Sequence, residues 1–212
     1  MRRVVPAVVL PVSALTLLSG CGGTDEPAAP VEATGNAAAG TSGTSAAPGG
    51  ELTATLLDAA GAEVGTVAFA EVEAGTEVSV EVTGLPPGFH GFHVHAVGRC
   101  EPDSVSPSDP AMTGDFLSAG GHLGADTAAH GAHAGDLPLL HVTEAGTGSL
   151  TAVTDALTPA DLADADGSAV MVHANSDNYA NIPEVYAPAG PNPTTLATGD
   201  AGSRIACGTV GG

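Results

Sequence analysis

The sequence predicts an all-β domain of short antiparallel strands, arranged as a sandwich or a barrel. Apolar and polar residues alternate in short runs, most clearly where Ser79 and Glu81 separate Val78, Val80 and Val82. A period of two places the apolar side chains on one face of a strand. Turn residues separate the runs, as expected for hairpins in a sandwich or barrel.

The folded part is expected to be one domain over residues 51–212. Residues 1–20 begin with a basic segment and continue as an apolar stretch broken by prolines, which is typical of an export signal. The stretch ends in Leu-Ser-Gly-Cys, and Cys21 resembles the lipidated cysteine of bacterial lipoproteins. Two acyl chains on Cys21 would anchor the protein to the outer face of the bacterial cell membrane. An ordinary signal peptide containing a cysteine is the alternative.

Residues 21–50 are expected to form a flexible linker after the lipidated cysteine. They contain almost no large apolar side chain, so they cannot bury enough surface to offset the entropy of ordering. About 160 residues remain, which is enough for a hydrophobic core.

The strands of the domain are predicted from local patterns. Leu52, Ala54 and Leu56 alternate with polar neighbours, and a second run covers Val64–Phe69 after the turn at Gly61. Further strands are predicted at Phe89–Val97, Leu139–Glu144, Gly148–Thr154, Ala169–His173 and Ile205–Gly208.

One short helix and two long loops complete the expected organisation. The helix should begin after Thr158, which can cap it, with Pro159 in the first turn and Asp161 near the positive end. Glu101–Leu137 and Ala174–Ser203 are rich in Gly, Pro, Asp and Asn and do not resemble strands. Loops of this length inside a compact domain are usually functional.

The charge balance is strongly acidic. The chain has 24 acidic and four basic residues, and the basic ones are Arg2, Arg3, Arg99 and Arg204. Removal of residues 1–20 would leave two arginines against 24 acids, a formal charge of −22. Nucleic-acid binding is not expected, since almost nothing could neutralise phosphates. The acidity favours solubility.

Two cysteines lie in the domain. If Cys21 carries lipid, Cys100 and Cys207 are an even pair in an exported protein, where disulfides persist. A bridge would close a loop of more than a hundred residues and stabilise the fold by roughly 4–5 kcal/mol. Two free thiols are the alternative.

Histidines supply the strongest chemical signal. In His93-Val94-His95 both imidazoles leave the same face of a strand, although two solvent-facing histidines would show the same pattern. His122 follows two glycines that allow a tight backbone turn. His130, His133 and Asp136 follow at a spacing that suits Zn²⁺, and His173 ends an apolar strand.

Together these segments resemble the bacterial Cu/Zn superoxide dismutases. The matching stretches are Gly88–His95, Ser118–His122, His133–Pro138, Val172–Ala174 and Gly199–Gly208. Asn181, Ile182, Pro183 and Tyr186 are similar to the lipoprotein branch of the family. The resemblance implies a Greek-key eight-stranded β-barrel with long metal-binding and electrostatic loops. It also implies an oxidoreductase that converts superoxide to dioxygen and hydrogen peroxide by alternate reduction and oxidation of bound copper.

The resemblance further implies one copper and one zinc per subunit. The copper ligands would be His93, His95, His122 and His173, and the zinc ligands would be the bridging His122 with His130, His133 and Asp136. Arg204 would stand beside the open copper position and act in catalysis with His122. Asp177 would link a copper-site histidine to a zinc-site histidine, His90 would bind backbone near the site, and Cys100 would pair with Cys207. A homodimer is a possible assembly.

Two departures from the family pattern affect the expectations. Only two residues separate His130 from His133, so either both ligate from one turn or one is displaced and zinc binds weakly. All four zinc ligands are present, so a zinc site is expected. The chain has no lysine, so the rate should depend less on electrostatic steering than in lysine-rich relatives. His141 is expected to be an ordinary strand histidine.

Two other functions fit parts of the sequence. A non-enzymatic lipoprotein that binds copper or zinc would explain the histidines but not Arg204 or the bridging position of His122. A structural or adhesion domain would explain the strands and the acidity, but would leave the ligand pattern as a coincidence.

Overall fold

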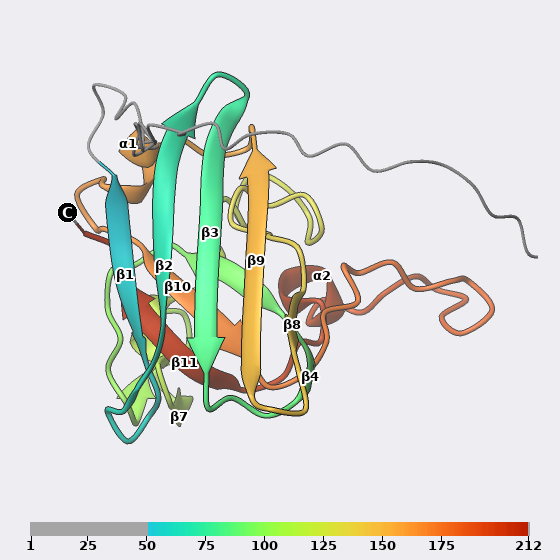
Figure 1. The fold of residues 1–212 in the computed structure, drawn as a ribbon. Helices are drawn as coiled ribbons and strands as arrows, with labels where there is room; N and C mark the ends of the chain where they lie inside the picture. Colours follow the sequence, from blue (N-terminus) through green and yellow to red (C-terminus); the bar gives the residue numbers. More distant parts are fainter. Residues whose placement is uncertain (1–50, 212) are drawn as a thin grey trace, which may run out of the picture. The chain divides into compact units, whose positions relative to one another are not determined.

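The computed structural model describes residues 51–211, which form one nearly closed antiparallel barrel. Figure 1 shows β1, β2, β3 and β9 side by side, with β10 and β11 crossing behind them and β8 next to β9. The strand order is β4-β8-β9-β3-β2-β1-β11-β10-β5. The strands are β1 (Leu52–Leu57), β2 (Glu63–Val72), β3 (Gly75–Thr83), β4 (Gly88–His90), β5 (Phe92–His95), β8 (Leu140–Val142), β9 (Thr147–Thr154), β10 (Ala169–His173) and β11 (Arg204–Thr209).

The barrel closes through the segment predicted as one strand at Phe89–Val97. In the structure this strand is interrupted at Gly91, and its halves β4 and β5 stand at opposite ends of the strand order. At the break, the amide of Gly91 donates to the carbonyl of Asn175 (2.8 Å), and its carbonyl accepts from the amide of His173 (2.8 Å). If β4 and β5 are counted as one bent strand, the sheet has eight strands. The predicted all-β barrel is confirmed.

The core follows from the alternating pattern of the strands. Val78 and Val80 on β3 lie opposite Phe69 and Val67 on β2, and all four are at most 2% exposed. The polar residues between them, such as Ser79, face outward. Removing these apolar side chains from water supplies most of the driving force for forming the barrel.

The short predicted helix is α1 (Pro159–Leu162). Thr158 accepts from the amide of Asp161 and the Asp161 carboxylate accepts from the amide of Thr158, which forms a capping box. Leu162 buries its side chain in the core, so the cap fixes a helix that is otherwise too short to be stable.

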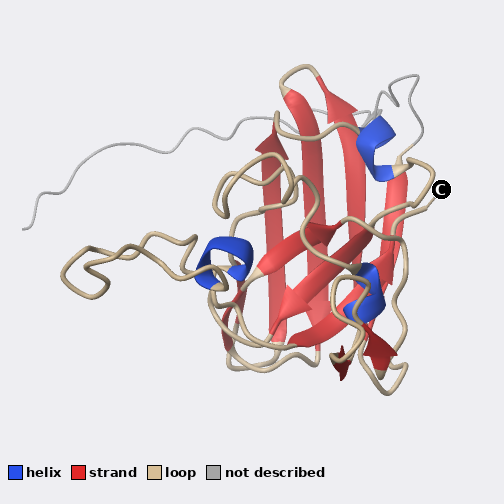
Figure 2. Cartoon of the chain, turned by 180° about the vertical axis from the view of Figure 1, so that it is seen from behind, coloured by secondary structure: helices blue, strands red, loops and turns tan. Residues whose placement is uncertain are grey.

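The two long segments predicted as loops contain short elements that the sequence did not predict. The first holds the hairpin of β6 (Ser104–Val105) with β7 (Thr113–Gly114) and the 3₁₀ helix η1 (Leu117–Ala119). The second holds α2 (Thr195–Thr198), and the part before α2 extends away from the barrel (Figure 2).

The predictions for the N-terminal region lie outside the described residues. They concern the export signal at 1–20, lipidated Cys21 and the linker at 21–50. Within residues 51–211, none of the helices has the length and apolar character needed to cross a bilayer.

Candidate metal centre

Hydrogen bonds of the backbone bring the histidine-bearing segments together around β5. His93 and His95 are at most 1% exposed and lie beside β10, which ends at His173. On the other side, isolated bridges pair His95 with His122 and His93 with Asp136. Residues that are up to 80 positions apart in the chain therefore meet at one strand.

Val94, between the two β5 histidines, holds the loop in place. Its amide donates to Gly135 (2.8 Å), and its carbonyl accepts from Leu123 (2.9 Å). A Cβ on Gly135 would lie 2.2 Å from the carbonyl oxygen of Val94, so only glycine allows this approach. The sequence neighbours of Leu123 and Gly135 are His122 and Asp136, whose side chains are thereby aimed at the strand.

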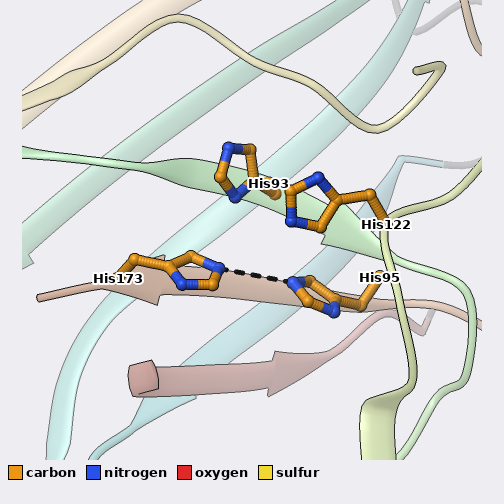
Figure 3. Close-up of side chains that lie close together, drawn as sticks. All are labelled: His93, His95, His122 and His173. Atoms are coloured by element: carbon orange, nitrogen blue, oxygen red, sulfur yellow. Dashed lines mark hydrogen bonds between the residues drawn. The ribbon is translucent and has the colours of Figure 1, made fainter. Parts of the chain in front are cut away.

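Four buried histidines form a first donor group, in which one nitrogen of each ring lies within 4.8 Å of the others: His93, His95, His122 and His173 (Figure 3). His95 Nδ1 donates to the Gly120 carbonyl (2.9 Å) and His173 Nδ1 to the Gly202 carbonyl (3.1 Å). In the neutral rings each Nε2 therefore carries a lone pair. These two Nε2 atoms lie 3.4 Å apart, an arrangement that favours a cation between them.

His93 completes this group with a nitrogen that has no partner. Its Nε2 donates to Asp177 Oδ2 at 2.6 Å, so Nδ1 carries the lone pair. Nδ1 is buried and accepts no hydrogen bond. A buried polar atom without a partner is costly, and a bound metal ion would satisfy it.

A second donor group surrounds Asp136. Its Oδ1 lies 3.0 Å from His122 Nδ1 and 3.3 Å from Nδ1 of both His130 and His133. Three imidazole nitrogens and one carboxylate oxygen therefore converge, even though only two residues separate His130 from His133. His130 Nδ1 makes no hydrogen bond and is buried, like the unpaired nitrogen of His93.

Asp177 joins the two groups from outside. Its carboxylate accepts from His93 Nε2 (2.6 Å) and from His130 Nε2 (2.8 Å), and it also accepts from the amide of Tyr179 (2.7 Å). Burial alone would raise the pKa of Asp177, but these hydrogen bonds outweigh it and lower the pKa. The ionised carboxylate fixes the proton of each ring on Nε2.

The donor chemistry fits copper in the first group and zinc in the second. Four imidazole nitrogens suit Cu²⁺, whereas three imidazoles with one carboxylate suit tetrahedral Zn²⁺. Burial lowers the pKa of His122 to about 4, although Asp136 opposes the shift. Burial would raise the pKa of Asp136, but the hydrogen bond from His122 and the nearby His130 lower it to about 2. At neutral pH the His122 imidazole is thus neutral and the Asp136 carboxylate ionised, as metal binding requires.

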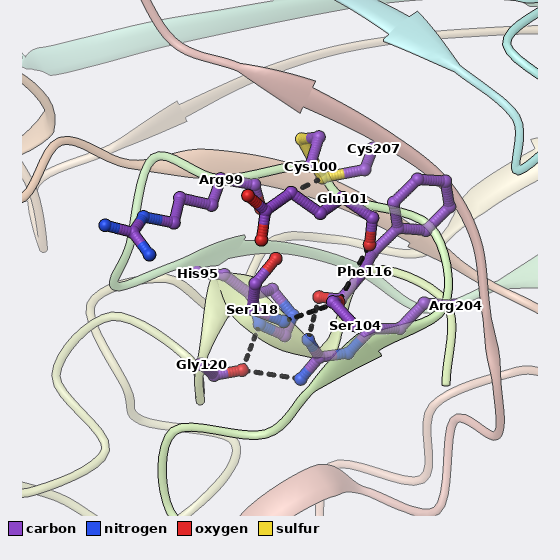
Figure 4. Close-up of a disulfide and its surroundings, with 10 residues drawn as sticks. All are labelled: His95, Arg99, Cys100, Glu101, Ser104, Phe116, Ser118, Gly120, Arg204 and Cys207. Carbon is purple, nitrogen blue, oxygen red and sulfur yellow. Dashed lines mark hydrogen bonds between the residues drawn. A yellow bond between two sulfur atoms is a disulfide. The ribbon is translucent and has the colours of Figure 1, made fainter. Parts of the chain in front are cut away.

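Arg204 lies beside the first group. Its guanidinium donates to the carbonyls of Phe116 and Gly120, and the Gly120 carbonyl also accepts from His95 Nδ1 (Figure 4). Burial lowers the pKa of Arg204 to about 10, so the side chain remains charged at neutral pH. Burial lowers the pKa values of His95 and His173, and the positive charge of Arg204 lowers them further.

An open cleft of about 1090 Å³ leads to this group, and His95, His122, His173 and Arg204 line it. Three carboxylates, those of Asp58, Asp115 and Asp200, line the same cleft. Apart from the histidines, Arg204 is the one basic side chain among its described lining residues. An anion in this cleft would meet three carboxylates and a single guanidinium.

The predicted disulfide joins Cys100 to Cys207, with an S–S distance of 2.04 Å, so the alternative of two free thiols does not hold. It links the beginning of the first long loop to β11, which also carries Arg204. Phe116 and Met171 pack in the buried cluster around it. The bridge therefore fixes the loop whose carbonyls hold the guanidinium.

The remaining histidines lie outside the donor groups. His90 Nδ1 and Nε2 are within 2.7 and 2.8 Å of the carbonyls of His173 and Pro86, so it binds backbone near the site. His141 is exposed on β8 and packs against Phe89.

Sequence reasoning missed some residues that position the site. The carbonyls of Phe116, Gly120 and Gly202 carry no side-chain signal, although glycines beside His122 and Arg204 marked two of these places. Tyr179, whose amide binds Asp177, carried no signal at all.

The fold and the site define a class: an antiparallel β-barrel with two adjacent donor groups suited to copper and zinc. A family model described as copper/zinc superoxide dismutase matches residues 63–210. The chain belongs to the copper/zinc superoxide dismutase family. The predicted enzyme class and the two cofactors are thereby confirmed at the level of the family.

Curated relatives and solved structures agree with this assignment. The superoxide dismutase [Cu-Zn] of Mycobacterium tuberculosis is 41% identical over 173 residues, which cover 77% of this chain and 72% of that protein. The Escherichia coli protein of the same name is 32% identical, over 76% of this chain and 86% of the relative. The structure of the Brucella abortus Cu/Zn superoxide dismutase has a TM-score of 0.59 and 30% identity, covering 76% of this chain and all of that one. A superoxide dismutase-like protein from Bacillus subtilis has a TM-score of 0.56 and 29% identity, covering 74% and 96%.

Proposed function

We propose that this chain is a superoxide dismutase that acts at the bacterial cell surface. The observation that carries the proposal is the pair of buried donor groups that share His122 and open through a cleft beside Arg204. In this proposal His93, His95, His122 and His173 hold copper. His122, His130, His133 and Asp136 hold zinc.

The assignment of His133 rather than His93 to zinc follows from the hydrogen bonds. His93 also lies within 4.8 Å of donor atoms in the second group. Its Nε2 is bound to Asp177, however, and its Nδ1 is available to the first group. His133 Nδ1 lies 3.4 Å from His122 Nδ1 and 3.3 Å from Asp136 Oδ1, a suitable separation for ligands of one ion.

Bound copper would supply the reversible one-electron chemistry that dismutation requires. The overall reaction takes two superoxide anions and two protons to dioxygen and hydrogen peroxide. Arg204 attracts the anion and orients it by charge-assisted hydrogen bonds, since its guanidinium lines the cleft and stays charged at neutral pH.

His122 is suited to handle one of the two protons. Its Nδ1 faces Asp136, so Nε2 is the nitrogen available to the copper group and can hold a proton between half-reactions. That proton can pass to the reduced product, and solvent in the open cleft supplies the other.

Metal content and activity of matched variants test the proposal. The purified chain is loaded with copper and zinc, and both metals per chain are measured together with superoxide consumption. His122→Ala should lower turnover by at least about a hundredfold, because it removes a ligand and a proton carrier. His141→Ala, which alters an exposed histidine outside the groups, is the control.

The principal alternative is a non-enzymatic lipoprotein that binds copper and zinc. It requires neither the guanidinium nor a shared imidazole. Full copper occupancy without superoxide consumption would establish this alternative, and unchanged turnover in His122→Ala would refute the proposed role of that residue.

The proposed surface location depends on Cys21. The export signal and the linker at 21–50 support an anchored enzyme that protects the cell surface from superoxide made outside the cell. Cys21→Ala should move the protein from the membrane fraction to the medium or periplasm, as measured by immunoblotting. Unchanged membrane association would exclude the anchor.

A further inference from the structure

The connection between His130 and His133 is very short and contains only small residues. Only Gly131 and Ala132 separate the two histidines. The amides of Gly131 and His133 donate to Asp136 Oδ2 at 2.7 and 3.0 Å, which fixes the backbone of the turn. Gly131 has no side chain and that of Ala132 is a single methyl group, so the connection offers little side chain to support the ring of His130.

Tyr179, from the second long loop, packs against that ring. The aromatic planes of Tyr179 and His130 are nearly parallel, with an interplanar angle of 11° and centroids 6.3 Å apart. The Tyr179 hydroxyl donates to the carbonyl of Leu137, the residue after Asp136, at 3.3 Å. The tyrosine thus spans the second donor group.

The backbone of Tyr179 makes two further contacts with the same region. Its amide donates to Asp177 Oδ1 (2.7 Å), the oxygen that also accepts from His130 Nε2 (2.8 Å). Its carbonyl lies against Gly131, where an added Cβ would be only 2.7 Å away. Tyr179 therefore contacts the His130 ring, its hydrogen-bond partner Asp177 and the adjacent Gly131.

Tyr179 holds this place in an unfavourable conformation. Its φ is 53° and that of Ala180 is 54°, in the left-handed region that non-glycine residues seldom adopt. Such strain persists only where surrounding contacts enforce it, and it concentrates at functional sites.

We propose that Tyr179 is a positioning residue for the zinc site. It holds His130 in the orientation that zinc ligation requires. This inference rests on the proposed zinc site. His130 must direct Nδ1 toward Asp136 while Nε2 remains on Asp177. The tyrosine ring restricts rotation of the imidazole out of this plane, and its amide holds the Asp177 carboxylate in place. The second long loop thereby supplies the packing that the two-residue connection lacks.

The test uses the full-length protein with copper bound. Zinc affinity is measured by competition with a chromogenic chelator, and Co²⁺ is bound in place of zinc so that its visible absorption reports ligand geometry. Tyr179→Leu should weaken zinc binding about 10–100-fold and change the Co²⁺ spectrum, as expected when a group supporting a ligand is lost. Tyr179→Phe keeps the ring and should stay within about threefold of the parent chain, because the lost hydrogen bond is long.

The chain contains one other tyrosine, which provides a matched control. Tyr186 is 81% exposed in the same loop, so Tyr186→Leu should leave both zinc affinity and the Co²⁺ spectrum unchanged. If Tyr179→Leu does not fold, as judged by circular dichroism, Tyr179→Met replaces it with a side chain of similar reach and no ring. Parental zinc affinity and spectrum in the folded ring-free variant would overturn the inference.

The proposed zinc site and the role of Tyr179 can fail separately. If the parent chain takes up no zinc, or His130→Ala does not alter uptake, the zinc site itself is wrong and the inference falls with it. If the parent chain binds zinc through His130 but the ring-free variant binds it equally well, only the role of Tyr179 is refuted.

Discussion

Replacing Asp177 tests how far one carboxylate organises both donor groups. Its two oxygens accept three N–H donors, those of His93 Nε2, His130 Nε2 and the Tyr179 amide, at distances of 2.6–2.8 Å. Asparagine has one oxygen, so in Asp177→Asn the amide NH₂ must face at least one of these donors. Asp177→Ala leaves all three without an acceptor.

The expected effect follows from the cost of an unpaired buried donor, about 1–3 kcal/mol. One unpaired donor in Asp177→Asn corresponds to about a 10–100-fold loss of zinc affinity, since about 1.4 kcal/mol is tenfold. Asp177→Ala should lose more, and copper affinity should fall as well, because His93 is no longer held with its lone pair on Nδ1.

Chelator competition for zinc and copper, on the folded variants, measures these losses. Asp126→Asn is the control, because Asp126 is an exposed carboxylate in the loop between His122 and His130. Parental affinities for both metals in folded Asp177→Ala would refute the reasoning, since the ring orientations would then not depend on the shared acceptor.

Three further perturbations have defined outcomes. The second-order rate constant with superoxide should stay flat or rise as salt increases from about 10 to 200 mM, because three carboxylates and one guanidinium line the cleft; a steep fall in stopped-flow assays would contradict this. In the metal-free protein, the folded-state pKa of His122 is about 4 and its ordinary value is 6.5, so the unfolded state binds more protons between these values. The free energy of unfolding should therefore be highest above about pH 6.5 and fall by about 3 kcal/mol as the pH drops to about 4. Melting temperatures that do not change over this range would exclude such a shift in the pKa of His122. Replacing both Cys100 and Cys207 by Ser should lower the free energy of unfolding by about 5 kcal/mol, since the bridge spans 107 residues; a loss below about 1 kcal/mol in urea titrations would show that the loop is already ordered without it.

The strands of the barrel could be predicted from the sequence because their signal is local. The alternation of Val78, Val80 and Val82 reports one buried face directly, and the Thr158 cap identifies α1 from four residues. The break at Gly91 could not be predicted in the same way. It depends on the hydrogen bonds that Gly91 donates to the Asn175 carbonyl and accepts from the His173 amide, and these residues lie more than 80 positions away in the chain.

The candidate ligands were identifiable because their residue types are few and their spacing is regular. The groups that orient them were harder to find, since most act through the backbone. The carbonyls of Gly120 and Gly202 bind His95 and His173, and any residue type carries a carbonyl. The elements β6, β7, η1 and α2 are two to four residues long, too short for a period to be visible.

The bend at Gly91 gives barrel closure and metal binding a common origin. The segment that seals the seam also carries His93 and His95, while its partner β10 ends in His173. Separation of these two strands would move His173 away from His93 and His95, which are three of the four candidate copper ligands. Any ion bound there consequently links β5 to β10 and stabilises the whole sheet. Its binding free energy opposes global unfolding rather than the fraying of one loop.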